Sequence, residues 1–355
     1  MKVSIHKSVL ETVLVNTQPY LEKKDLSQIT SHLYLRTFED ALEIKATDYE
    51  IGLTYHTHSI KIINEGIATA NGKKLLDIIK ILKDDEITLE TINDYLYIKQ
   101  KNSKFKLPMF NPSDFPDFPH VDEKPKFDIN STQLVRAIKK IAPAIDTNNP
   151  KFELNGALID IKENYINLVA TDTKRLALIK LEAPTDHAFS LIIPKKAISE
   201  IQKLFFDDIE IFYDGTTLIA KSNHFQFFTK LINGKFPDYA RIIPQEKKYR
   251  LRLAKEKIVE SLKQIAIISQ EMKLTFKPDK ITFESLNDDN IEAKTEIEFV
   301  TGLEEEIYLA LNSRYMLDFL SNIEESSFTL GYNDAGLPFT LESENFKTII
   351  MPIMI

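Results

Sequence analysis

The chain has 355 residues, too many for one ordinary core, and the usual domain size predicts two or three domains. Hydrophobic residues make up 43%, and the absence of cysteine excludes disulfides, a thiol nucleophile and a zinc–thiolate site. The formal net charge of −8 argues against nucleic acid, because most duplex-binding proteins are basic. No apolar stretch is long enough for a membrane helix and no signal peptide is evident, so we expect a cytoplasmic protein.

An alternating strand followed by an amphipathic helix recurs three times along the chain. The strands are predicted at residues 3–5, 127–129 and 251–253, so successive copies lie 124 residues apart. The apolar residues of the following helices recur at a spacing of three or four, which is typical of a helix packed by one face. They are Leu10, Val13 and Leu14, then Leu134, Ile138 and Ile141, then Ile258, Leu262 and Ile265.

A second helix is predicted inside each copy, at residues 72–82, 194–204 and 312–322. Pro194 suits the first turn of a helix, and Asn312 is a candidate N-cap. Short segments such as 95–98, 218–220 and 280–283 have the composition of strands. The triplet Ala-Thr-Asp occurs at 46–48 and again at 170–172, which favours a structural turn role for Asp48 and Asp172.

Proline-rich segments close the first two copies, at residues 115–119 and 236–239. Each is followed by a charged run, at 122–124 and 246–248, as expected of a linker. We therefore predict three repeated domains at residues 1–122, 123–247 and 248–355. Each would be an α+β domain with two helices packed on antiparallel sheets of about eight strands.

Several motifs with possible chemistry are better explained as structure. His56 and His58 share one face of a predicted strand, but no third metal ligand lies nearby in sequence. The segment 71–74 lacks the first glycine and the Ser/Thr of a phosphate loop. The pairs Asp84-Asp85 and Asp288-Asp289 lie in turn-like segments, and adjacent residues of a strand point to opposite faces. We predict no catalytic residue, no metal site and no cofactor.

Four motifs, in order and at the right spacing, resemble the bacterial DNA sliding clamp, the β subunit of DNA polymerase III. They are Leu-Asn-Gly at 154–156, the segment 170–177, Lys-Phe-Pro-Asp-Tyr at 235–239 and the tail 351–355. The resemblance covers the whole chain and implies a processivity factor, a non-catalytic accessory subunit of a DNA polymerase (nucleotidyltransferase) holoenzyme. It implies a head-to-tail homodimeric ring that slides on duplex DNA without sequence preference. The implied partners are the replicative polymerase α subunit, the clamp loader and other proteins with a clamp-binding motif.

The resemblance also implies a hydrophobic pocket for partner peptides between the second and third repeats. Arg175 and Arg241 could supply directed donors at its edge. The chain departs from the family at Thr173-Lys174, usually Gly-His or Ser-Tyr, and at Met354-Ile355, usually a basic residue and leucine. The matching positions are Leu154, Thr171, Thr173, Lys174, Arg175, Leu176, Pro237, Arg241, Ile242, Tyr315, Ile349, Met351, Pro352, Ile353, Met354 and Ile355.

Positive charge is concentrated on the predicted helices, as a ring for DNA requires. The six helices carry a net charge of +8, so the remainder of the chain carries −16. A mildly positive lining attracts phosphates without reading bases, although lysines on amphipathic helices can also merely solvate exposed faces. Arg136, Lys139 and Lys140 share one face and form the best cluster. The candidate DNA-lining residues are Lys73, Lys74, Lys80, Arg136, Lys139, Lys140, Lys195, Lys196 and Lys203.

Two other functions are compatible with the composition. One is a nuclease or polymerase subunit with its own carboxylate site, which metal-dependent activity of the isolated protein would reveal. The other is an assembly scaffold without a DNA role, which would not place its basic helices around a common hole.

Overall fold

The computed structural model describes residues 1–122, 124–127, 129–183, 188–206, 209–286 and 292–355. Its contacts divide the chain into two compact units. The first is Met1–Ser131 with Phe205–Leu231, and the second is Thr132–Leu204 with Ile232–Ile355. Among the described residues, no helix has the length and apolar character that a membrane span requires.

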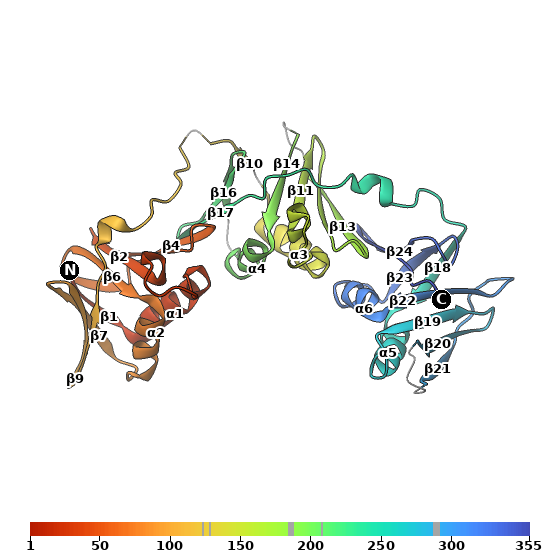
Figure 1. The fold of residues 1–355 in the computed structure, drawn as a ribbon, viewed down its shortest axis with the longest axis horizontal. Coiled ribbons are helices and arrows are strands. Elements are labelled where there is room, and N and C mark those ends of the chain that lie inside the picture. The colour runs from red at the N-terminus through yellow and green to blue at the C-terminus, as the bar shows by residue number, and fades with distance from the viewer. Residues whose placement is uncertain (123, 128, 184–187, 207–208, 287–291) are drawn as a thin grey trace. The chain divides into compact units, whose positions relative to one another are not determined.

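All six predicted helices are present (Figure 1). They are α1 (Lys7–Thr17), α2 (Gly72–Ile81), α3 (Ser131–Ile141), α4 (Lys195–Leu204), α5 (Lys255–Ala266) and α6 (Ser313–Ser321). The nine apolar residues that define the first helix of each repeat are all buried, as the spacing predicted. Asn312 is confirmed as an N-cap, since its side chain accepts from the Arg314 N–H at 3.0 Å, and Asn71 caps α2 in the same way.

The first unit contains two antiparallel sheets. The smaller has the order β5 (Ile60–Asn64), β1 (Lys2–His6), β7 (Glu86–Ile92), β8 (Tyr95–Gln100) and β9 (Ser103–Pro108). The larger has the order β10 (Lys126–Phe127), β15 (Glu210–Tyr213), β16 (Thr217–Lys221), β17 (Phe225–Lys230), β4 (Ile51–Thr57), β3 (Ala41–Thr47), β2 (His32–Phe38) and β6 (Gly66–Asn71). The strand predicted at 127–129 is corrected to β10, because only Lys126 and Phe127 pair with β15; Asp128 lies outside the described residues.

The second unit also contains two antiparallel sheets. The larger has the order β14 (Phe189–Pro194), β11 (Gly156–Lys162), β12 (Tyr165–Thr171), β13 (Arg175–Glu182), β25 (Phe346–Ile350), β24 (Phe339–Ser343), β23 (Ser327–Tyr332) and β18 (Tyr249–Ala254). The smaller has the order β21 (Lys294–Glu298), β20 (Lys280–Ser285), β19 (Glu271–Phe276) and β22 (Ile307–Asn312). Helices α5 and α6 pack together, as α1 and α2 do in the first unit (Figure 1).

Each eight-stranded sheet is shared between two of the sequence repeats. In the first unit, β17 of the second repeat pairs with β4 of the first, from Phe225–Tyr55 to Thr229–Ile51. In the second unit, β25 of the third repeat pairs with β13 of the second, from Ile350–Arg175 to Phe346–Ile179. A repeat therefore completes its sheets with strands from its neighbour, which explains why compact units and sequence repeats do not coincide.

The recurring Ala-Thr-Asp triplet forms the same turn at both of its positions. Asp48 Oδ1 accepts from the N–H groups of residues 50 and 51, and Asp172 Oδ1 accepts from those of residues 174 and 175. The residue after each aspartate has a positive φ, 73° at Tyr49 and 70° at Thr173. The predicted structural role of both aspartates is confirmed, and each turn aims the following strand into the joint between repeats.

Candidate functional site

A buried apolar cluster lies where β13 meets β25. Leu154, Leu176 and Ile349 belong to it and are only 1–2% exposed. Leu154 comes from the short 3-10 turn Phe152–Asn155, while Leu176 and Ile349 are cross-strand partners. The cluster also contains Leu158, Val169, Ile192 and Phe236. Three predicted pocket residues are thus brought together, and as placed they form a closed apolar floor.

The segment after the Phe-Pro-Asp motif covers one side of this floor. Tyr239 and Ile243 pack against the cluster; Tyr239 begins the short 3-10 turn Tyr239–Ile242, and Ile243 follows it. Ile242 is 39% exposed, and the Arg241 side chain is 85% exposed with its Nε 2.8 Å from Asp238 Oδ2. A surface ion pair of this kind is weak, so Arg241 can exchange Asp238 for another acceptor, and its role as a donor at the pocket edge stays a prediction.

Tyr239 anchors that segment through its hydroxyl group. It donates to Asp160 Oδ2 at 2.7 Å and accepts from Asn167 Nδ2 at 2.8 Å. Burial, reinforced by the Asp160 carboxylate, raises the pKa of Tyr239 well above its usual value. Sequence reasoning missed Asp160 and Asn167, which are polar residues of the mostly apolar strands β11 and β12.

Arg175 has partners that sequence reasoning did not foresee. Its side chain is 5% exposed, with Nε 3.1 Å from Asp172 Oδ2 and Nη1 2.6 Å from Asp318 Oδ2. Nη2 donates to the carbonyl oxygen of Pro143, and the guanidinium lies 4.5 Å from the Tyr315 ring centroid. These bonds hold β13, α6 and the segment after α3 together, and the expected role of Arg175 as a donor at the pocket edge stays a prediction.

The C-terminal tail divides between two places. Strand β25 ends at Ile350, and the Met351 N–H then donates to the Lys174 carbonyl oxygen at 2.9 Å, beside the apolar cluster. The Ile353 N–H donates to Ala310 O at 2.9 Å. The last three residues line a separate cavity of about 390 Å³ with Tyr249, Tyr308 and Tyr332. The prediction that all five tail residues surround one pocket therefore needs correction, because the bond to Ala310 directs the end of the tail toward β22.

The candidate DNA-lining side chains are mostly exposed on their helices. Arg136 and Lys139 are exposed and Lys140 is half-buried, on the side of α3 opposite its buried apolar residues. Lys195 is less available, since its Nζ donates to Ile145 O at 3.0 Å and to Thr147 Oγ1 at 2.5 Å. Lys203 pairs with Glu200 at 2.8 Å. The remaining candidates, Lys73, Lys74, Lys80 and Lys196, are exposed.

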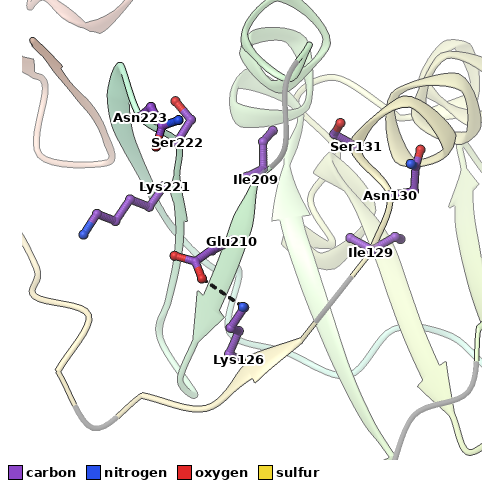
Figure 2. Close-up of a pocket in the computed structure, with 9 residues that line it drawn as sticks. All are labelled: Lys126, Ile129, Asn130, Ser131, Ile209, Glu210, Lys221, Ser222 and Asn223. Atoms are coloured by element: carbon purple, nitrogen blue, oxygen red, sulfur yellow. Dashed lines mark hydrogen bonds and ion pairs between the residues drawn. The ribbon is translucent and has the colours of Figure 1, made fainter.

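The first unit holds a cavity of about 550 Å³ that the sequence did not predict (Figure 2). It lies between β10, β15, β16 and the start of α3, and the Lys126–Glu210 ion pair at 2.9 Å crosses it. Within the described parts of the chain, no group of three or more His, Asp or Glu residues could hold a metal ion. His58 Nδ1 instead lies 3.1 Å from Asp40 Oδ1, and Asp85 Oδ2 lies 2.6 Å from Lys101 Nζ. Asp288 and Asp289 fall outside the described residues.

Three family models for the β subunit of DNA polymerase III match the chain in succession. The N-terminal domain matches residues 1–119, the central domain residues 128–238 and the C-terminal domain residues 240–354. The chain belongs to the family of bacterial β sliding clamps. As a member it is a processivity factor of DNA replication, an accessory subunit rather than the polymerase itself. The fold class predicted from the repeats, three α+β clamp domains with antiparallel sheets, is confirmed.

Relatives match over essentially the whole clamp. The β sliding clamp of Helicobacter pylori J99 is 39% identical over 99% of this chain and 100% of its own length. The clamp of Chlamydia pneumoniae is 26% identical over 99% of both. A crystal structure of the H. pylori clamp bound to a DNA ligase peptide has a TM-score of 0.95 and 40% identity, with full coverage of both chains. The DNA polymerase III β subunit of Pseudomonas aeruginosa, 24% identical with a TM-score of 0.93, has the same fold.

One exposed aromatic residue near the clamp's apolar cluster escaped the sequence analysis. Phe152 is 73% exposed, although it lies only two residues before the buried Leu154. A large aromatic side chain just ahead of the Leu-Asn-Gly motif was the available signal. Such residues are enriched where proteins bind partners, so Phe152 joins the candidate site.

Proposed function

We propose that the chain forms a homodimeric ring that encircles duplex DNA and tethers replication and repair proteins through the apolar site at β13 and β25. The observation that carries the ring is the repeated pairing of strands between successive repeats. In each joint, the last strand of one repeat pairs antiparallel with an inner strand of the preceding repeat: β17 with β4, and β25 with β13. A third joint of the same kind would close the ring.

Two strands at sheet edges correspond to the strands that form the first two joints, and they could form the third. Strand β9 is the counterpart of β17 and β25, since each follows its neighbour in the same antiparallel meander. Strand β21 is likewise the counterpart of β4 and β13. Both lie at sheet edges, where their open backbone groups can pair with another chain. Because β9 is in the first repeat and β21 in the third, the contact is head-to-tail, and two chains would give six repeats.

The side chains of the two edges complement each other. Lys104 and Lys106 are exposed on β9, while β21 carries Glu296 and Glu298 together with Lys294, and Glu296 also pairs with Lys280 at 2.9 Å. Exposed apolar residues lie at the ends of the adjacent helices: Ile81, the last residue of α2, is 72% exposed, and Ile267, directly after α5, is 83% exposed. Opposite charges flanking an apolar patch favour this pairing over pairing of like edges.

Charge reversal on β9 tests the ring. We expect Lys104→Glu/Lys106→Glu to be monomeric at micromolar concentration in light scattering, because it places like charges opposite β21. Lys61→Glu on β5, the other edge of the same sheet, is the control and should leave the dimer intact. A wild-type chain that is monomeric under these conditions would refute the proposed homodimeric ring. Retention on circular DNA after loading, with release on linearisation, then tests encirclement.

The apolar site is proposed to hold a short partner peptide that carries Gln and two apolar anchors. Support comes from the H. pylori clamp, whose structure contains a DNA ligase peptide. Leu154 and Leu176 are buried as placed, so a peptide would have to displace side chains beside them. Met351 follows β25 directly, is 42% exposed and has a side chain flexible enough to repack around a peptide. The proposed partners are the polymerase α subunit, the clamp loader and other proteins with such a motif, acting in the cytoplasm.

Deleting Met351–Ile355 tests the peptide site. Peptide affinity in fluorescence anisotropy and polymerase stimulation should both be lost, while the dimer persists because β9 and β21 are untouched. Unchanged peptide affinity would refute the assignment. Arg241→Ala should weaken peptide binding without changing the stability of the fold, since its exposed guanidinium contributes little to folding.

A basic lining is proposed for the hole of the ring. Replacing Arg136, Lys139 and Lys140 by Ala should weaken retention on DNA and reduce its salt dependence, with no change in sequence preference. The competing proposal of a metal-dependent nuclease or polymerase predicts hydrolysis or extension by the isolated protein with Mg²⁺. An active isolated chain would favour that alternative.

A further inference from the structure

A cavity of about 500 Å³ in the second unit brings part of the basic face of α3 next to several carboxylates. Arg136 and Lys140 line this cavity, whereas their neighbour Lys139 is not among its lining residues. Three of the carboxylates follow α6 or lie in the turn between β24 and β25. They belong to Glu324, Glu325 and Glu344, which we call the acidic rim; Glu182 and Lys180 of β13 line the same cavity and carry opposite charges.

Backbone contacts hold the acidic rim in position. The Lys180 N–H donates to Asn345 O at 3.0 Å, and Asn345 Nδ2 donates to Lys180 O at 2.9 Å. These two bonds fasten the turn that carries Glu344 to β13. Glu344 itself is exposed, as is Glu324.

Glu325 couples the rim to the helix. The Ser343 hydroxyl donates to its carboxylate and lowers the pKa of Glu325, and the charge of Lys140 acts in the same direction. The two groups therefore sense each other's charge although, among the described residues, no direct ion pair is formed between α3 and the rim. Lys140 is further held by the Phe346 ring, with Nζ 5.7 Å from its centroid.

We infer that the acidic rim weakens the grip of the clamp on DNA by competing with phosphates for Arg136 and Lys140. This inference rests on the proposed encircling function and names residues that set its strength. Each cation that neutralises a phosphate adds about 0.9 to the slope of log affinity against log salt. A cation whose field is already offset by a nearby carboxylate contributes less. Lys139, outside the cavity, keeps its full effect.

The rim gives a moving ring a physical advantage. Strong phosphate contacts must break at every step along the duplex, so a tightly bound ring would slide slowly. Carboxylates fixed beside two of the three cations of α3 lower the attraction without removing the cations. The clamp therefore keeps a positive lining that centres the duplex, while no single contact is strong enough to stop it.

Sliding of the loaded ring on end-blocked linear duplex tests the inference. The variant Glu324→Gln/Glu344→Gln removes two exposed charges and leaves Glu325, whose carboxylate accepts from Ser343. We expect its diffusion coefficient to fall about two- to fivefold at low salt, with a salt slope steeper by up to about 1.8 for the two sites. The difference should vanish at high salt. The control, Glu163→Gln/Glu246→Gln, changes net charge equally at exposed sites outside the cavity.

A double-mutant cycle identifies the partner of the rim. The slowing should disappear in an Arg136→Ala/Lys140→Ala background and persist in a Lys139→Ala background. Unchanged mobility of the rim variant, equal slowing by the control, or slowing that survives loss of Arg136 and Lys140 would each overturn the inference. Failure of the wild-type chain to stay on circular DNA would instead overturn the proposed function, so the two failures are distinguishable.

Discussion

Substitution of Arg175 can distinguish whether this residue stabilises the fold or binds the partner peptide directly. Its guanidinium joins Asp172, Asp318 and the Pro143 carbonyl oxygen, three points far apart in sequence, and is almost fully buried. Arg175→Ala would remove all three bonds and leave two carboxylates without their cation. We expect the second unit to be destabilised locally, and peptide binding to fall as a consequence of that loss.

The size of the effect follows from the exposure of the partners. Removing one member of a buried ion pair typically costs about 3–5 kcal/mol of stability, because the remaining charge stays buried without a counter-ion. The side chains of Asp172 and Asp318 are 18% and 29% exposed, so water can partly replace the lost cation. Adding the lost contact with the Tyr315 ring, we estimate a net destabilisation of ~2–3 kcal/mol.

Hydrogen exchange of β13 and α6 measures this loss directly, since it reports the free energy of local opening. The opening free energy should fall by ~2–3 kcal/mol in Arg175→Ala and by less than ~1 kcal/mol in the control Arg241→Ala, whose ion pair is at the surface. Peptide affinity should fall in both variants. Weakened peptide binding by Arg175→Ala with unchanged exchange would refute the reasoning and restore Arg175 as a direct donor.

Three further results are expected. Thr173→Gly should stabilise the fold by ~0.5–1 kcal/mol and raise the denaturation midpoint, because a β-branched residue has a φ of 70° there. Tyr49→Gly, at the equivalent position of the first repeat with a φ of 73°, is the matched control without a β-branched side chain. Burial and the charge of Lys74 lower the pKa of His32 from 6.5 to about 4, so stability present above pH 6.5 should be lost as pH falls toward 4, by up to ~2–3 kcal/mol. His32→Gln should flatten that dependence in circular dichroism melts. Tyr239→Phe should cost ~1–2 kcal/mol in urea denaturation, because it removes the hydroxyl that bonds both Asp160 Oδ2 and Asn167 Nδ2.

Local features of the fold were predictable because their causes are local. Apolar residues three and four apart identified all six helices, and the turn chemistry of Asp48 and Asp172 followed from their recurrence. The cap at Asn312 has the same short-range origin. The domain boundaries at 122/123 and 247/248 stay a prediction.

Long-range features were not predictable from one sequence. The pairing of β17 with β4 joins residues about 170 apart, and no local pattern encodes which edge meets which. The ion pair of Arg175 with Asp318 was not foreseen, because the two residues are 143 apart in sequence. The end of the tail looked like part of one pocket because a single backbone bond, from Ile353 to Ala310, decides its direction.

The sharing of sheets between repeats has a consequence for synthesis on the ribosome. Strand β4 ends at Thr57, but its partner β17 begins at Phe225, so the sheet of the first repeat stays open while about 170 more residues are made. At about 5–20 residues per second, that interval is roughly 10–30 s. During it the nascent chain exposes an unpaired edge to other nascent chains on the same message. The same wait recurs for β13, which ends at Glu182, because its partner β25 begins only at Phe346.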